Sequence, residues 1–175
     1  PARRKFLKRD ATEFAHAAQW IVRAALGVPG VGFRLENETA VVWNVPRSSP
    51  LAERIALFFG EEVSRKLLTL EIKGPVSVSG VVGRPEVWRS DRRYLYVYVN
   101  GRFVRDRLIT QAVTEAFRGY LVPGRFPFAV IKVELSPAEV DSNVHPAKAE
   151  VKFARPQQVF QAVFRAVRTA LEGAG

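Results

Sequence analysis

The stretch Tyr94-Leu-Tyr-Val-Tyr-Val-Asn-Gly-Arg-Phe-Val-Arg-Asp106 decides the fold of this 175-residue chain. Residues 94–99 are continuously apolar or aromatic, which predicts a central β-strand that is covered on both faces. The pair Asn100-Gly101 predicts a sharp turn, because both residues tolerate the backbone angles of tight turns. Asp106 can cap a following helix that closes at Gly119. A strand, a turn and a capped helix therefore form the centre of the predicted fold.

The segments upstream of this unit predict two helices and two strand pairs. A capping pattern of Asp10 with Glu13 precedes apolar residues at helical spacing, so a first helix is expected over residues 11–26. The remaining upstream elements are a hairpin over 31–35 and 40–43, a helix from Ser49-Pro50 to Gly60, strands over 66–72 and 76–82, and a polar loop over 83–93.

Downstream, apolar runs over 128–135 and 149–153 predict two more strands, and Pro156 begins a last amphipathic helix. The glycines are assigned to turns and helix ends and form no phosphate-binding loop of the G-x-G-x-x-G or Walker type. Strands grouped before a strand-helix-strand-strand-helix unit indicate an α+β fold, with one mixed sheet packed by helices.

Composition limits the function classes. The 20 arginines and 7 lysines outnumber the 17 acidic residues and give a net charge of +10, which favours a polyanionic partner such as nucleic acid. The same arginine excess also suits a GC-rich or heat-adapted source. The chain has no cysteine, and His16 and His145 lack metal-ligand spacing, so no metal site is expected. No apolar run is long enough for a bilayer, and the N-terminus lacks the pattern of a secretory signal, so we expect a cytoplasmic protein that does not contact membranes.

The segment Asp141-Ser-Asn-Val-His-Pro-Ala-Lys148 predicts a stiff polar loop that presents one lysine. Asp141 and Asn143 suit a turn, because short polar side chains bond their own backbone two residues on. His145 and Pro146 stiffen the approach to the lysine, since proline restricts its own backbone and that of the residue before it. Lys148 is a compact charge on a flexible stem and suits a phosphate held outside the loop. On physical grounds alone, a solvated surface lysine remains the alternative.

Three ordered blocks resemble the DNA mismatch repair protein MutL family. Residues 141–153 are similar to its D-V-N-V-H-P-x-K-x-E-V-x-F signature, with Ser142 in place of the second residue, valine. Residues 98–107 are similar to its V-N-G-R-x-V-x-D block, and residues 1–7 to the end of its N-T-P-A-R-x-K-F-L motif. The resemblance covers the chain from its first residue to about Phe153.

The resemblance implies a transducer-type fold, like the second domain of gyrase B, with a left-handed strand-helix-strand crossover. Residues 1–30 would be a lead-in segment and helix that join from an ATPase subdomain, and residues 31–175 the transducer domain. In the full-length protein Lys148 would contact the γ-phosphate of ATP, bound with Mg in that subdomain, while Asn143, His145 and Pro146 support its loop. The chain alone would neither hold ATP tightly nor hydrolyse it.

The resemblance also implies a role in the DNA damage response through sequence-independent DNA binding, and with it a nucleoid-associated location. Near the Asn100-Gly101 turn, Arg102, Arg105 and Arg107 are the candidates for a basic groove, although an ordinary solvated face would show the same pattern. Implied partners of the full protein are DNA, a MutS-type mismatch sensor and a second copy of itself. Two other functions stay open at this point: a free-standing nucleic-acid-binding module without a nucleotide link, and a small-molecule phosphotransferase.

Overall fold

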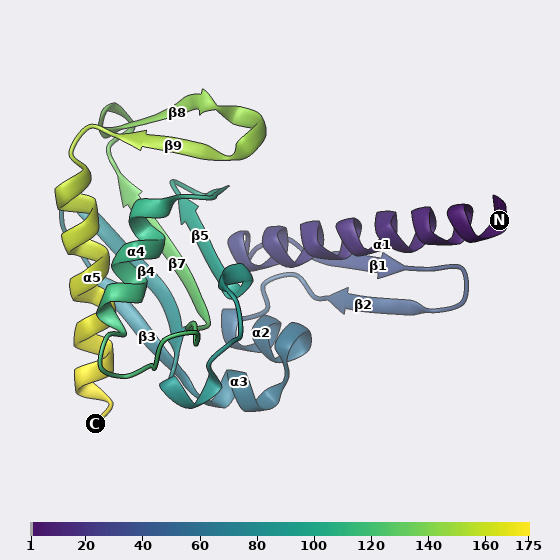
Figure 1. Ribbon diagram of the computed structural model, residues 1–175, viewed down its shortest axis with the longest axis horizontal. Coiled ribbons are helices and arrows are strands. Elements are labelled where there is room, and N and C mark those ends of the chain that lie inside the picture. The colour runs from purple at the N-terminus through teal and green to yellow at the C-terminus, as the bar shows by residue number, and fades with distance from the viewer. Residues whose placement is uncertain (1) are drawn as a thin grey trace.

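A computed structural model describes the backbone of residues 2–175 and the side chains of residues 10–145 and 147–175. Its centre is one mixed sheet, which confirms the expected α+β class (Figure 1). The strands lie in the order β3 (Leu67–Ile72), β4 (Val76–Gly83), β7 (Ala129–Leu135), β5 (Leu95–Val99) and β6 (Arg102–Val104). Every neighbouring pair is antiparallel except β5 and β7, which run parallel.

Helices cover both faces of the sheet. Side chains of β5 alternate between two apolar clusters, because successive residues of a strand point to opposite faces. Val97 and Val99 join a cluster with α4 (Arg107–Ala116) and α5 (Pro156–Gly173). Tyr96 and Tyr98 join a second cluster with α1 (Ala2–Gly27) and α2 (Leu51–Phe59). The prediction that this strand is covered on both faces is therefore confirmed.

The middle strand is β7 and not β5. The run 94–99 predicted the central position, but β5 has only the three-residue β6 between it and the sheet edge. The sequence could not separate the two positions, because any inner strand that is covered on both faces has the same apolar composition as the middle strand. Between the parallel strands β5 and β7 the chain passes through β6 and α4. In Figure 1 both β5 and β7 point upward, and α4 lies in front of the sheet. The chain passes from β5 to β7, which lies to its left, so the crossover is left-handed.

The first helix begins earlier than predicted. It starts at Ala2, so Asp10 lies inside α1 as an exposed residue and does not cap it. Residues 2–10 contain no proline or glycine that would stop a helix, and a capping pattern is compatible with a start without requiring one. The side chains of residues 2–9, and all of Pro1, lie outside the described residues.

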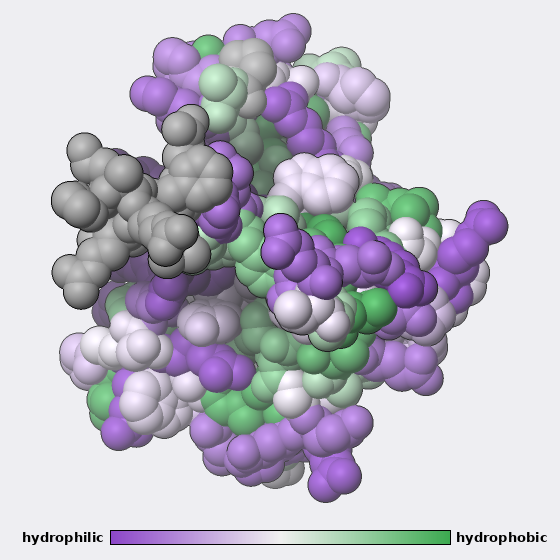
Figure 2. Space-filling view, turned by 90° about the vertical axis from the view of Figure 1, so that its right-hand side faces the viewer, coloured by the Kyte–Doolittle hydropathy of each residue, from purple (hydrophilic) through white to green (hydrophobic). Residues whose placement is uncertain are grey.

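The hairpin expected near residue 37 is present as β1 (Phe33–Glu36) and β2 (Val41–Val45). The Asn37 side-chain oxygen closes its turn by accepting the backbone N–H groups of Thr39 and Ala40, at 3.0 and 2.9 Å. Figure 1 shows that α1 and this hairpin extend away from the sheet. Figure 2 looks onto their end of the molecule, where hydrophilic and hydrophobic residues intermingle.

A second hairpin replaces part of the predicted polar loop. Residues Val140–His145 form β8, which pairs antiparallel with β9 (Glu150–Phe153) through an irregular register. The loop interpretation of residues 141–145 was therefore wrong. Side chains along β8 are mostly exposed, so the strand lacks the apolar alternation that would reveal it in the sequence.

The remaining elements are short. They are α3 (Glu61–Arg65), which the sequence did not predict, and single turns of 3-10 helix at Pro85–Val87, Arg92–Tyr94, Pro137–Glu139 and Pro146–Lys148. In the part of the chain that the structure describes, no helix has the length and apolarity needed to cross a membrane.

Candidate functional site

Lys148 lies at the turn between β8 and β9. Pro146–Lys148 form one turn of 3-10 helix, and Ala149 then takes a left-handed backbone conformation, with φ of 55°, to lead into β9. Lys148 is exposed, and among the side chains that the structure describes it has no hydrogen bond and no ion pair. Its amine is therefore free to meet an anion that approaches the tip of the hairpin.

Polar contacts shape the approach to this lysine. The Asp141 carboxylate accepts the backbone N–H of Asn143 at 2.9 Å, which is the local bond that the sequence predicted. The imidazole Nε2 of His145 lies 3.9 Å from a carboxylate oxygen of Glu150 across the hairpin. The side chain of Pro146 lies outside the described residues.

The lysine hairpin is tied to the segment that follows β5. The backbone N–H of Arg105 donates to the backbone oxygen of Ala149 at 2.9 Å. A guanidinium nitrogen of Arg102 donates to the backbone oxygen of Ser142 at 3.2 Å. These two contacts join the exposed lysine turn to the candidate DNA-binding arginines.

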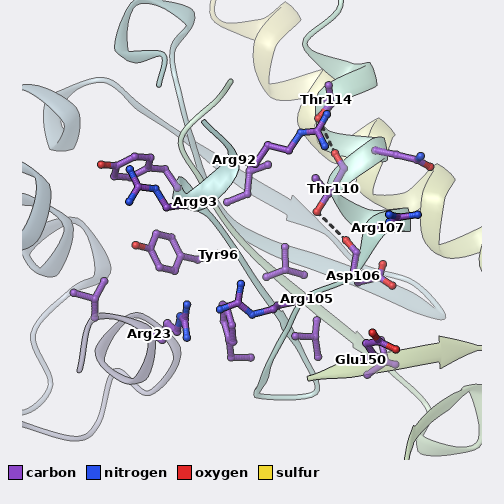
Figure 3. Close-up of a pocket in the computed structure, with 18 of the residues that line it drawn as sticks. Arg23, Arg92, Arg93, Tyr96, Arg105, Asp106, Arg107, Thr110, Thr114 and Glu150 are labelled. Atoms are coloured by element: carbon purple, nitrogen blue, oxygen red, sulfur yellow. Dashed lines mark hydrogen bonds between the residues drawn. The ribbon is translucent and has the colours of Figure 1, made fainter. Parts of the chain in front are cut away.

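A groove of about 1460 Å³ runs from α1 across β5 and β6 to the start of α4 (Figure 3). Its arginines come from three places: α1, the 3-10 turn before β5, and the segment that leads from β6 into the first residue of α4. That segment is fixed because the Asp106 carboxylate accepts the N–H of Ile109 at 2.8 Å and caps α4, as predicted. The groove is lined by five arginines: Arg23, Arg92, Arg93, Arg105 and Arg107.

Two of these arginines share one aromatic ring. The guanidinium carbon of Arg23 lies 4.7 Å from the centroid of the Phe103 ring, and that of Arg105 lies 5.9 Å from the same centroid. Burial lowers the pKa of Arg23, and the charge of Arg105 lowers it further. Figure 3 shows both side chains directed into the groove, near Tyr96. Burial raises the pKa of the Tyr96 phenol, so it is neutral at physiological pH.

The acidic residues of the groove are engaged elsewhere. Asp106 caps α4, and burial raises the pKa of its carboxyl group. Glu115 forms an ion pair with Arg118 at 2.9 Å, and Glu150 faces His145. The groove's five arginines outnumber these three carboxylates, so the groove keeps a net positive charge.

The structure brings together two of the three predicted DNA-binding arginines. Arg105 and Arg107 line the groove, whereas Arg102 is directed toward β8. The sequence missed Arg23, Arg92 and Arg93 as members of the same groove. Arg92 and Arg93 belonged to a stretch predicted as a polar loop, but nothing in the sequence linked α1 to residue 105. Whether these arginines bind DNA stays a prediction.

The described residues contain no group of three or more histidine, aspartate or glutamate side chains that would suit a metal ion.

Comparison with known proteins assigns the family. Residues 55–172 match the family described as "DNA mismatch repair protein, C-terminal domain". A relative from Anaeromyxobacter dehalogenans strain 2CP-1, named DNA mismatch repair protein MutL, is 43% identical over 175 residues. That match covers 99% of this chain and 29% of the relative, so the chain spans less than a third of that relative's length.

Solved structures agree with the fold. The crystal structure of the N-terminal domain of a DNA repair protein matches 99% of this chain and 57% of its own, with a TM-score of 0.75 and 18% identity. The Aquifex aeolicus MutL ATPase domain complexed with ADP matches 78% of this chain and 48% of its own, with a TM-score of 0.54 and 27% identity. Since the family match covers most of the chain and the identity to a MutL protein reaches 43% over nearly all of it, this chain belongs to the DNA mismatch repair protein MutL family.

Proposed function

We propose that this chain is the transducer part of a MutL ATPase and that Lys148 contacts the γ-phosphate of ATP held by a neighbouring ATPase subdomain. The observation that carries the proposal is the exposed lysine without a described partner, at the tip of a hairpin whose backbone is fixed to β6. Residues 1–30 would join that subdomain to residues 31–175. The chain alone is expected to hydrolyse no ATP.

The chemistry of Lys148 fits this role. When ATP is bound, its triphosphate supplies the concentrated negative charge that the ammonium group meets. A lysine without a competing carboxylate keeps its charge available, and its long stem tolerates small changes in distance. The related Aquifex aeolicus MutL ATPase domain was solved with ADP, which supports a nucleotide in the full protein. The hairpin would then report whether the terminal phosphate is present.

The arginine-lined groove is proposed as the DNA-binding surface. Its guanidinium groups suit phosphodiester oxygens, and binding through the backbone would be independent of base sequence. A MutS-type mismatch sensor and a second copy of the protein are proposed as further partners of the full-length protein. The hairpin contacts of Arg102 and Arg105 place the DNA-binding candidates beside the lysine turn.

Lys148→Ala in the full-length protein is expected to lower ATP turnover about tenfold or more, because one charge-assisted contact to phosphate is lost. Steady-state phosphate release, with circular dichroism to check the fold, measures the effect. The matched control is Lys152→Ala, which removes an exposed lysine four positions further along the same hairpin. Turnover at the wild-type level in Lys148→Ala would contradict the assignment.

Arg105→Glu is expected to weaken binding of a short DNA duplex and to reduce the salt dependence of its binding constant. Each neutralised phosphate contributes a slope of about 0.9 in log K against log salt, and reversal of the charge removes at least one such contact. A fluorescence titration at several salt concentrations measures both quantities. Arg165→Glu, an exposed charge reversal on α5 outside the groove, is the control. Equal loss in both variants would assign the effect to net charge alone.

A free-standing nucleic-acid-binding module is the alternative function. It would lose DNA binding in Arg105→Glu but would show no nucleotide-dependent change that requires Lys148. The ATPase measurement on Lys148→Ala therefore separates the two functions.

A further inference from the structure

Arg23 and Arg105 come from distant parts of the sequence and meet at one ring. Arg23 is carried by α1, which packs on the sheet, and Arg105 follows the short edge strand β6. Their guanidinium carbons lie 4.7 and 5.9 Å from the centroid of Phe103. Both guanidinium groups thus lie near the same aromatic ring, and the pKa of Arg23 is lowered by burial and by the positive charge of Arg105.

Hydrogen bonds hold the backbone at both arginines, so the fold sets the distance between the points from which the two side chains start. The Tyr98 hydroxyl donates a short hydrogen bond to the backbone oxygen of Arg23 and holds that turn of α1 against β5. The N–H of Arg105 donates to the backbone oxygen of Ala149 at 2.9 Å. The guanidinium groups can therefore shift only through rotation about the bonds of their own side chains.

Among the described residues, no carboxylate is paired with either arginine. Of the groove's three acids, Asp106 caps α4, Glu115 pairs with Arg118, and Glu150 lies 3.9 Å from the His145 imidazole. Two of the other groove arginines differ in this respect or in their stacking partner. Arg93 pairs with Asp91 at 2.9 Å, and Arg92 lies 5.2 Å from the centroid of Phe126.

We propose that Arg23 and Arg105 form a two-sided clamp for a single phosphate group, with Phe103 as its wall. An anion between the two guanidinium groups would replace their repulsion with two charge-assisted contacts, and each planar group can offer two N–H donors to phosphate oxygens. The burial of Arg23 strengthens the contact, because electrostatic interactions weaken less where water is partly excluded. The inference rests on the proposed function in one respect: the natural phosphate would be a phosphodiester of DNA.

The clamp would also connect the two parts of the chain. One of its arms belongs to the lead-in helix and the other to the link between β6 and α4. A phosphate held by both would stabilise the packing of α1 on the sheet, in addition to the apolar contacts of Val22 and Leu26 in that cluster.

The first test compares the melting temperature of the full-length protein in inorganic phosphate and in chloride at equal ionic strength. Wild type is expected to melt about 2–4 °C higher in phosphate, as for a ligand at roughly ten times its dissociation constant. Arg23→Gln, Arg105→Gln and the double variant are each expected to lose this increment to the same extent, because one arm alone is not a clamp. Arg165→Gln is expected to keep it.

If the melting temperature of Arg23→Gln still rises from chloride to phosphate as much as that of wild type, the clamp is wrong. If Arg23→Gln does not fold, Arg105→Gln decides alone, since Arg105 is exposed and its backbone contact does not need the side chain. The second test measures the salt slope of duplex DNA binding, which Arg23→Gln is expected to reduce by about 0.9. An unchanged slope with a lost phosphate increment would keep the clamp for free phosphate and would overturn its assignment to DNA.

Discussion

Arg54→Met is expected to lower the free energy of unfolding by about 3–5 kcal/mol, because it removes a buried charge that satisfies several backbone groups at once. Arg54 lies on α2 and is 1% exposed. Its guanidinium group donates to five backbone oxygens at 2.7–3.1 Å and to the Ser49 hydroxyl at 2.8 Å. The five oxygens belong to Ala25, Val28, Pro29, Val31 and Pro46.

Backbone carbonyls take the place of a counter-ion at this site. Ala25 belongs to the last turn of α1, where carbonyl groups lack partners within the helix and the helix dipole is negative. The other carbonyls come from the links on either side of the β1–β2 hairpin. Methionine fills much of the volume of the arginine stem but donates no hydrogen bond, so these oxygens would be buried unsatisfied or would admit water.

Urea unfolding of the chain, followed by circular dichroism, measures the change. Arg65→Met is the matched control, since Arg65 is exposed on the neighbouring helix α3 and should tolerate the change within about 0.5 kcal/mol. A similar small effect for Arg54→Met would show that the hydrogen-bond cluster contributes little. The same variant tests the groove, because Arg54 fixes the end of the helix that carries Arg23.

Arg54 also shows where sequence reasoning stops. The predicted helix from Ser49-Pro50 to Gly60 is present, and Leu51, Ile55, Phe58 and Phe59 form its apolar face. A charged residue next to that face is predicted to be exposed to solvent, because arginine is almost never fully buried without a partner. Its partners here are carbonyls from the last turn of α1 and from the two links that flank the β1–β2 hairpin, and no local sequence pattern shows that a later helix will bind them. The same limit applies to Arg23 and Arg105, whose meeting depends on how α1 crosses the sheet.

Local chemistry was predicted well. The turn at Asn100-Gly101, the capping of α4 by Asp106 and the bond from Asn143 to Asp141 follow from side chains that act on their own backbone. The errors occurred where pairing between segments decides the outcome. The exposed strand β8 forms because β9 lies beside it, and its own residues carry no signal of a strand.

The sequence analysis also did not identify Gly80 as a position where the fold requires glycine. The glycines were assigned to turns and helix ends, but Gly80 lies inside β4, between β3 and β7. Its φ of 113° is a conformation that side chains disfavour. A Cβ atom at this position would lie 2.0 Å from the backbone oxygen of Val130 in the middle strand. Glycine is needed here because two backbones approach more closely than a side chain allows.

Gly80→Ala is therefore expected to lower the free energy of unfolding by about 3 kcal/mol or more, as backbone strain and a steric clash act together. The backbone oxygen cannot rotate away as the end of a side chain could, so β4 and β7 would have to separate locally. Gly119→Ala isolates the strain: its φ is 88°, but a Cβ atom there has no neighbour within 4 Å. Urea unfolding of both variants should give a cost of about 1 kcal/mol for Gly119→Ala. Equal costs would mean that β4 relaxes around the new methyl group and that close approach to Val130 is not what requires glycine.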